Sequence, residues 1–383
     1  MKALRNYLDK IKPHVEKGGK FHYMHSTFEA FETFLFVPNT VTKKGSHIRD
    51  AIDLKRTMFM VVIALVPALL FGMWNVGYQH NLSIGVDADI ITNFFYGFWL
   101  VLPIIIVSYV VGLGTEFVFA QMRGHEVNEG FLVSGFLIPL IVPVTTPLWM
   151  VGLATLFAVI IGKEVFGGTG MNIMNPALLA RAFLFFAYPS QMSGDKVWIA
   201  DRADAFSGAT PLGELMTATD KVHLPSVADA FFGFIPGSVG ETSTLAILIG
   251  AAILLFSGIG SWRVMFSVFI GGFAMGWVFN MFSANAYMSD VPAYYHLILG
   301  GFAFGAVFMA TDPVTAAQTN TGKYIYGVLI GIMAVLIRVI NPAYPEGMML
   351  AILLLNVFAP TIDYYVVQSN IKRRLKRAKK VAA

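Results

Sequence analysis

Long stretches without a charged side chain dominate the pattern of hydrophobic and polar positions along the chain. Six stretches of at least 21 residues contain no Asp, Glu, Lys or Arg. A helix needs about 20 apolar residues to cross the hydrocarbon core of a membrane, so each stretch has room for at least one span. A helix on the surface of a soluble domain keeps a polar face, which these stretches lack. The pattern therefore predicts an all-α membrane protein. The stretches are 57–86, 90–115, 130–162, 242–262, 264–289 and 291–311.

We expect about ten transmembrane helices from this pattern. The third is short and has Pro139, Pro143 and Pro147 near its end. Proline removes a backbone hydrogen bond and breaks or kinks a helix, so an interrupted helix is expected there. The predicted spans are 57–75, 93–119, 129–143, 149–166, 173–189, 242–260, 262–283, 294–311, 323–340 and 346–365.

The distribution of Lys and Arg predicts the orientation, because cytoplasmic loops are rich in both residues. With the N-terminus inside, 22 of the 27 basic residues lie before the first span, in the inside turns or in the C-terminal tail. Only Lys196, Arg202 and Lys221 face the other side. We therefore expect a multi-pass protein of the bacterial inner membrane with both termini in the cytoplasm.

Two short motifs occur twice and indicate an internal repeat. Pro-Val-Thr stands at 143–145 and 313–315, and Asn-Pro-Ala stands at 175–177 and 341–343. In the predicted topology the two copies of each motif face opposite sides, which is typical of inverted repeats of five helices. The predicted organisation is a cytoplasmic amphipathic region, a first repeat, an outer loop, a second repeat and a basic cytoplasmic tail. These parts cover 1–56, 57–189, 190–241, 242–366 and 367–383.

Composition narrows the chemistry that the chain can carry. Hydrophobic residues make up 56% of the chain and charged residues 13%, and cysteine is absent. The absence of cysteine excludes disulfides and iron–sulfur clusters held by thiolates of this chain. Redox work would therefore need an organic cofactor, a histidine-held cofactor or a partner subunit. The net charge of +4 gives no reason to expect a nucleic-acid partner, because the basic residues fall where a membrane protein places them.

The predicted outer loop, 190–241, contains the sequence Ser207-Gly208-Ala209-Thr210 after Asp204. By itself this is a turn of small residues. Small neighbours also let a bulky covalent group approach the backbone, whose free N–H groups can hold a phosphate. The residues alone leave both interpretations open.

The pattern Asp-x-x-Ser-Gly-Ala-Thr resembles the flavin-attachment signature of the B and C subunits of the sodium-translocating NADH:quinone oxidoreductases. The D subunit of the related ion-translocating ferredoxin:NAD oxidoreductases has it too. The resemblance implies FMN joined through its phosphate to Thr210, with Asp204, Ser207, Gly208 and Ala209 around it; Ala205 departs from the usual glycine. The stretches 18–20, 47–50 and 53–56 resemble the quinone-reducing B subunits. Other segments that resemble this family are 163–170, 175–177, 181–183, 309–313 and 341–348.

The resemblance also implies a second, non-covalent flavin, riboflavin, near Asn172 and Asn175. An asparagine before proline is a common helix cap, so a purely structural role is the alternative. A quinone site is implied near Gly112 and Glu116, although Leu113 replaces the family's second glycine.

Two aromatic residues, Phe183 and Phe185, are further candidates for the quinone region. They could pack on the quinone ring or the flavin. At that spacing, ordinary packing between helices is the alternative.

Acidic residues in or beside spans are costly, so Asp312, Asp363 and Glu116 are candidates for a sodium route. Thr311 or Thr315 could add oxygen ligands to Asp312, whereas Asp363 could simply face water. Lys163 with Glu164, and Arg181 or Arg338, could form internal ion pairs or bind a flavin phosphate.

The resemblance therefore implies a membrane subunit of a redox-driven sodium pump, which passes electrons from covalent FMN through riboflavin to quinone. The chain has no glycine-rich dinucleotide motif after a strand, so a partner must oxidise NADH. Expected partners are the other membrane and peripheral subunits, including a flavin-carrying C subunit and the NADH-oxidising subunit. The alternatives are the ferredoxin-linked D subunit and a solute channel without redox activity.

Overall fold

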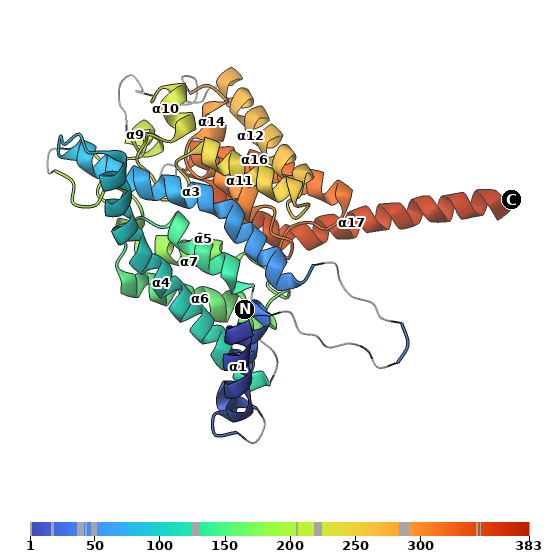
Figure 1. Ribbon diagram of the computed structural model, residues 1–383. Helices are drawn as coiled ribbons and strands as arrows, with labels where there is room; N and C mark the ends of the chain where they lie inside the picture. Colours follow the sequence, from blue (N-terminus) through green and yellow to red (C-terminus); the bar gives the residue numbers. More distant parts are fainter. Residues whose placement is uncertain are drawn as a thin grey trace.

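The computed structural model describes most of the chain and is helical throughout the described part (Figure 1). Asp204 and Ala205, which belong to the flavin-attachment pattern, lie outside the described residues. The described residues are 2–16, 19–36, 42, 44–46, 52–124, 130–203, 206–217, 224–282, 291–341, 344 and 346–382.

Six helices in the described part are long and apolar enough to cross a membrane. Their outward-facing residues are large and apolar, as at Trp99 and Phe266, and a lipid environment explains that exposure. The prediction of a multi-pass, all-α membrane protein is confirmed. These helices are α3 (Leu54–Ser83), α4 (Ile90–Arg123), α6 (Leu148–Gly162) continued by η2 (Glu164–Phe166), α12 (Trp262–Met281), α16 (Asn320–Ile340) and α17 (Met348–Ala382).

Three further apolar helices are too short to cross a bilayer unaided: α5 (Phe131–Ile141), α7 (Pro176–Ala187) and α11 (Thr244–Phe256). Helix α5 stops where Val142 turns to extended backbone, so the third predicted span is interrupted as expected. Helices α7 and α11 are shorter than the fifth and sixth predicted spans, 173–189 and 242–260. Pro176 starts α7 only after the Asn175 cap.

The eighth predicted span, 294–311, is wrong as a single helix. It consists of α14 (Tyr295–Ile298), α15 (Phe302–Phe304) and a turn of π-helix, η3 (Gly305–Met309). Gly300 separates the first two pieces in a left-handed conformation with φ of +63°. Residues 302–310 are buried, so protein surrounds this irregular backbone and no lipid contacts its open polar groups.

The N-terminal region packs on the helices of this chain. It contains α1 (Lys2–Val15), η1 (His22–Met24) and α2 (His25–Leu35). The ring of Phe31 lies 6.1 Å from that of Phe117 on α4. The Arg56 guanidinium at the start of α3 donates to the last carbonyls of α2, at 3.3 Å for Thr33 and 3.2 Å for Phe34.

Packing partners correspond between the two halves of the chain. Helix α4 packs on α5 and α6, and α12 packs on η3 and α16 in the same relative order. The halves meet where α3 packs on α11 and where α7 packs on α17. This correspondence is partial, because the extensive packing of α3 on α4 has no counterpart of similar extent between α11 and α12 in the described part. The two repeats of five helices and their inversion in the membrane remain a prediction. Beyond these contacts α17 projects far from the other helices (Figure 1).

The segment between the halves carries three short helices: α8 (Pro189–Met192), α9 (Pro211–Thr217) and α10 (Val227–Phe232). Two contacts fix it against the second half of α3. The amide of Asn75 donates to the Ile235 carbonyl at 3.0 Å, and Nδ1 of His80 lies 2.9 Å from the Ala200 carbonyl. This segment therefore lies toward the C-terminal end of α3.

Candidate functional site

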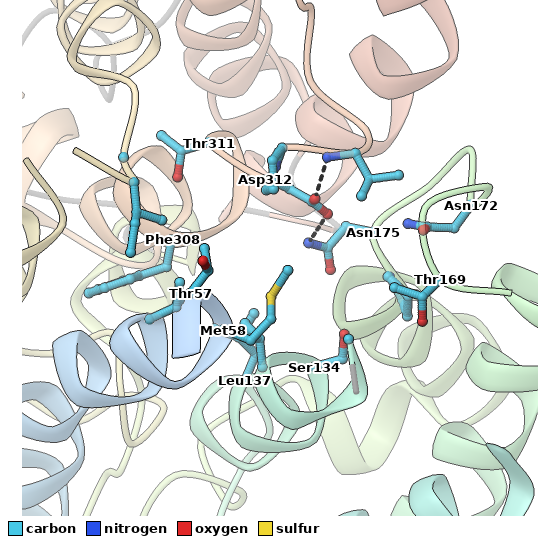
Figure 2. Close-up of a pocket in the computed structure, with 18 of the residues that line it drawn as sticks. Thr57, Met58, Ser134, Leu137, Thr169, Asn172, Asn175, Phe308, Thr311 and Asp312 are labelled. Carbon is cyan, nitrogen blue, oxygen red and sulfur yellow. Dashed lines mark hydrogen bonds between the residues drawn. The ribbon is translucent and has the colours of Figure 1, made fainter. Parts of the chain in front are cut away.

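A pocket lies on the seam between the two halves; we call it the seam pocket, and its empty volume of about 830 Å³ includes open solvent at the mouth. Figure 2 shows side chains from α3, α5, the loop before α7 and the η3 region pointing around one hollow. Both asparagines singled out in the sequence line it, together with Asp312 and Thr311. The structure thus brings together the candidate flavin residues and one candidate sodium residue.

Asn175 has two roles in this pocket at once. Its Oδ1 accepts from the backbone N–H groups of Ala177 and Leu178 at 3.0 and 3.3 Å, which caps α7. Its Nδ2 donates to Asp312 Oδ2 at 3.1 Å, drawn as a dashed line in Figure 2. The cap and the contact across the pocket therefore coexist. Asp312 Oδ1 also accepts from the N–H of Val314 at 2.9 Å.

The walls of the seam pocket are chemically divided. One set of lining side chains is apolar, and another set carries amides, hydroxyls and charges, which suits a flat apolar ligand with a polar edge. Apolar lining residues include Met58, Val61, Leu137, Leu254, Ile259 and Phe308. Polar lining residues are Thr57, Ser134, Lys163, Thr169, Asn172, Asn175, Thr311 and Asp312.

Lys163 connects the seam pocket to Glu116 on α4. Lys163 lines the pocket, its ammonium forms an ion pair with Glu116, and the two side chains are only 4% and 3% exposed. The expectation that Lys163 pairs with Glu164 is wrong. Glu164 instead accepts from Arg123 Nη1 at 3.2 Å. The adjacent residues Lys163 and Glu164 therefore bind two residues of α4, Glu116 and Arg123, that are seven positions apart.

Gly112 permits the close approach of α4 and α5. A Cβ atom at this position would lie 2.0 Å from the ring of Phe131. Leu113, which replaces a glycine of the family pattern, packs against the hydrophobic core. The candidate quinone residues Gly112 and Glu116 thus occupy the same buried face of α4.

Phe183 and Phe185 are not gathered with Gly112 and Glu116. Phe183 stacks on Phe157 with ring centroids 4.7 Å apart, and Phe185 lies edge-on to Tyr344 at 4.6 Å. Phe183 stands eight positions beyond the Asn175 cap, which is about 12 Å along a helix. Both rings pack between helices in this structure.

A second, smaller pocket of about 330 Å³ lies beside Thr210; we call it the loop pocket. Thr210 is half-buried, and its Oγ1 accepts from the N–H of Gly213 at 3.1 Å. Ser207 is exposed, Ala209 is half-buried and Gly208 is buried. A Cβ atom at position 208 would lie only 2.7 Å from the Asp195 carbonyl oxygen. This close approach explains the glycine.

The far wall of the loop pocket contains a buried cluster of ion pairs. Arg181 on α7 donates to Glu241 Oε1 at 2.6 Å and also to Glu346. Ser238 donates to the other oxygen of Glu241. Sequence reasoning identified Arg181 but neither acid, although both stand directly before apolar runs.

The second intramembrane arginine, Arg338, donates hydrogen bonds to backbone carbonyls. It is fully buried and donates to the carbonyls of His296, Leu299 and Glu346 at 2.8, 3.1 and 3.2 Å. These carbonyls belong to the broken segment around α14 and to the residues before α17. Arg338 therefore holds the backbone around the short helix α14 and the residues before α17.

The two pockets lie at different levels of α3. The seam pocket contacts Thr57 and Met58, whereas Ile235 of the loop pocket is bound by Asn75. These levels are separated by about 25 Å along the helix. The structure therefore places Thr210 and the asparagine pair toward opposite ends of the membrane helices.

Asp363, the last sodium candidate, binds the start of α16. Its carboxylate accepts from the backbone N–H groups of Gln318 and Thr319 at 2.6 and 3.0 Å, and from the Thr319 hydroxyl at 2.5 Å. It lies apart from the residues that line the seam pocket.

Comparison with known proteins gives one consistent result. The family described as NQR2, RnfD, RnfE matches residues 41–372. A protein of Chromohalobacter salexigens is 51% identical over 401 residues, covering 98% of this chain and 97% of that protein. Proteins of Stutzerimonas stutzeri and Pseudomonas aeruginosa are each 50% identical, covering 98% of this chain and 99% of theirs. All three are named as the B subunit of a Na(+)-translocating NADH-quinone reductase.

Proposed function

Because the chain belongs to the NQR2, RnfD, RnfE family, we propose that it is the B subunit of a sodium-translocating NADH-quinone reductase. The family description also names RnfD, but full-length identity near 50% to several B subunits favours this assignment. The chain is then a membrane subunit of a redox-driven sodium pump. The basic N-terminal region and tail support an inner-membrane protein with both termini in the cytoplasm.

The seam pocket is the proposed site of riboflavin, and the observation that carries this proposal is the pairing of Asn175 with Asp312 inside it. The pocket fits the group, because its apolar walls match a flat ring system and its amides match the ring's polar edge. Asn172 and Asn175 would hold that edge. A bound flavin would accept and pass on single electrons, while the chain supplies its position and electrostatic surroundings.

Thr210 is the proposed attachment point of FMN. Thr210 is half-buried rather than enclosed, and small residues precede it, which leaves room for a phosphate beside it. The contact from the N–H of Gly213 fixes the hydroxyl and remains possible after ester formation, because the oxygen keeps its lone pairs. The position at the loop pocket would put this FMN far from the seam pocket along the membrane helices.

Asp312 is the leading residue for the sodium route. Sodium favours hard oxygen ligands, and Asp312 lines an open pocket together with Thr311 and Thr57. Neither Glu116 nor Asp363 is among the residues that line this pocket, and Glu116 is held by Lys163. The place of Asp312 in the pocket wall makes it a better candidate than either of them.

Quinone reduction is proposed near Gly112 and Glu116, on the α4 face that Lys163 links to the seam pocket. Phe183 and Phe185 are left with a packing role. The NADH-oxidising subunit and a flavin-carrying C subunit are the proposed partners that deliver electrons.

Flavin analysis of the purified complex tests this function. We expect non-covalent riboflavin in the acid extract, and a fluorescent band for this chain after denaturing electrophoresis. Thr210→Val should abolish the fluorescence and leave the extracted riboflavin unchanged. A complex without extractable flavin, or a Thr210→Val chain that still fluoresces, contradicts the respective cofactor site.

A further inference from the structure

We propose that Lys163 is a positioning residue that raises the reduction potential of the flavin in the seam pocket, and that Glu116 behind it attenuates this effect. The inference rests on the proposed function, namely that the seam pocket holds a flavin. It adds a role for an ion pair whose partners are 47 positions apart in the chain.

The first step of the argument is the position of Lys163. Among the residues that line the seam pocket, all of them described in the structure, Lys163 carries the positive charge and Asp312 the negative charge. Lys163 follows directly after α6, whose C-cap it forms, and it is 4% exposed. The ammonium is therefore held in place by protein rather than by water.

The second step concerns charge. One electron added to a bound ring system adds one negative charge and breaks no bond. A buried cation near that charge stabilises the reduced form, because Coulomb interactions are strong where water is excluded. Lys163 consequently favours reduction, and Asp312 opposes it from another element.

The third step concerns Glu116. Its carboxylate faces the Lys163 ammonium from α4, so the ring experiences an ion pair instead of a full positive charge. Removing only the carboxylate charge would expose the whole charge of Lys163 to the pocket. Removing both charges would leave Asp312 unopposed. The two changes must therefore shift the potential in opposite directions.

A neighbouring ion pair provides a matched control. Arg123 and Glu164 join the same helix α4 to the residue directly after Lys163, but neither lines the seam pocket. Loss of this pair changes the packing of the same region without changing the charge at the pocket wall.

The experiment measures the potential of the non-covalent flavin in the intact detergent-solubilised complex. The complex is reconstituted with ¹⁵N-labelled riboflavin, so that vibrational difference spectra during a redox titration report this flavin alone. The variants are Glu116→Gln, the double variant Lys163→Met with Glu116→Gln, and the control Arg123→Met with Glu164→Gln. Extracted flavin is quantified for each preparation.

We expect Glu116→Gln to favour the reduced flavin by about tenfold, which is ~59 mV for a one-electron couple. The double variant should disfavour the reduced flavin by a similar factor, and the reduction potential of the control should equal that of the wild type. Equal potentials in all four proteins overturn the inference, as do shifts of the same sign in the two test variants. If the double variant does not assemble, Glu116→Gln against the control still decides the sign. A wild type without riboflavin in the seam pocket contradicts the proposed cofactor site instead.

Discussion

The side-chain amide of Asn175 donates to the carboxylate of Asp312 at 3.1 Å, joining two positions that are 137 residues apart. One residue stands before the last helix of the first half, and the other follows the broken segment of the second half. The same asparagine caps α7 through its oxygen. A single side chain thus starts a helix and ties the halves together across a pocket.

Asn175→Asp should separate these two roles. Aspartate caps a helix as well as asparagine does, so α7 should keep its start. The new carboxylate would face Asp312 without a donor, and like charges repel at this distance. We expect the complex to assemble with a similar melting temperature but to lose most of its extractable riboflavin. Full riboflavin content in this variant would show that the amide–carboxylate contact is not required.

Gly112→Ala and Gly114→Ala form a matched pair on α4. A Cβ at position 112 meets the Phe131 ring at 2.0 Å, whereas nothing lies within 4 Å of a Cβ at position 114. Overpacking of this kind costs about 1–3 kcal/mol. Gly112→Ala should lower the thermal midpoint and the rate of quinone reduction, and Gly114→Ala should change neither. Equal effects of the two variants would refute the packing argument.

Arg181→Met should destabilise the protein strongly. It leaves the buried carboxylates of Glu241 and Glu346 without their shared cation, and breaking a buried ion pair costs about 3–5 kcal/mol. Asp9→Asn is the control, because the pair of Asp9 with Arg5 is exposed and worth under ~1 kcal/mol. Denaturation of the purified complex, followed by tryptophan fluorescence, measures both variants. A midpoint for Arg181→Met equal to that of the control would contradict this assignment.

Asp312→Asn should raise the sodium concentration needed for half-maximal quinone reduction, by about tenfold if one ligand contact of ~1.4 kcal/mol is lost. Asp363→Asn is the comparison, since Asp363 is not among the residues that line the seam pocket and its oxygens accept from the start of α16. We expect the sodium dependence of this second variant to stay near that of the wild type. A larger shift in Asp363→Asn than in Asp312→Asn would move the sodium route to the other acid.

Gly208→Val should reduce FMN attachment at Thr210. The new side chain collides with the Asp195 carbonyl, which displaces the loop that presents the threonine. Ser207→Ala is the control, because Ser207 is exposed and its removal leaves the backbone path unchanged. In-gel flavin fluorescence per amount of protein should fall at least several-fold in Gly208→Val and remain in Ser207→Ala. Undiminished fluorescence in Gly208→Val contradicts this role of the glycine.

The sequence indicated the membrane class, because charge-free stretches reflect the cost of charge in lipid. Nine of the ten expected spans coincide approximately with apolar helices, of which six in the described part are long enough to cross a membrane. The prediction failed at the eighth span. Residues 294–311 are as apolar as a helix that faces lipid, but they lie inside the protein. There, packing against neighbouring helices stabilises broken and π-helical backbone that lipid would not tolerate.

The candidate site shows the same division. Local pattern was enough to single out Asp312, because an acid at the end of an apolar run is visible in a few consecutive residues, whereas Asn175 and Thr210 were singled out by the resemblance to the family. The sequence did not show which charged side chains form ion pairs with one another. Lys163 pairs with Glu116 rather than with adjacent Glu164, and Arg181 binds two acids 60 and 165 positions away. The sequence by itself determined a polytopic helical protein and indicated candidate residues for its chemistry, whose roles remain a prediction. Only the tertiary structure decided which charges meet, because a buried charge selects its partner by the distance across packed helices and not by the distance along the chain.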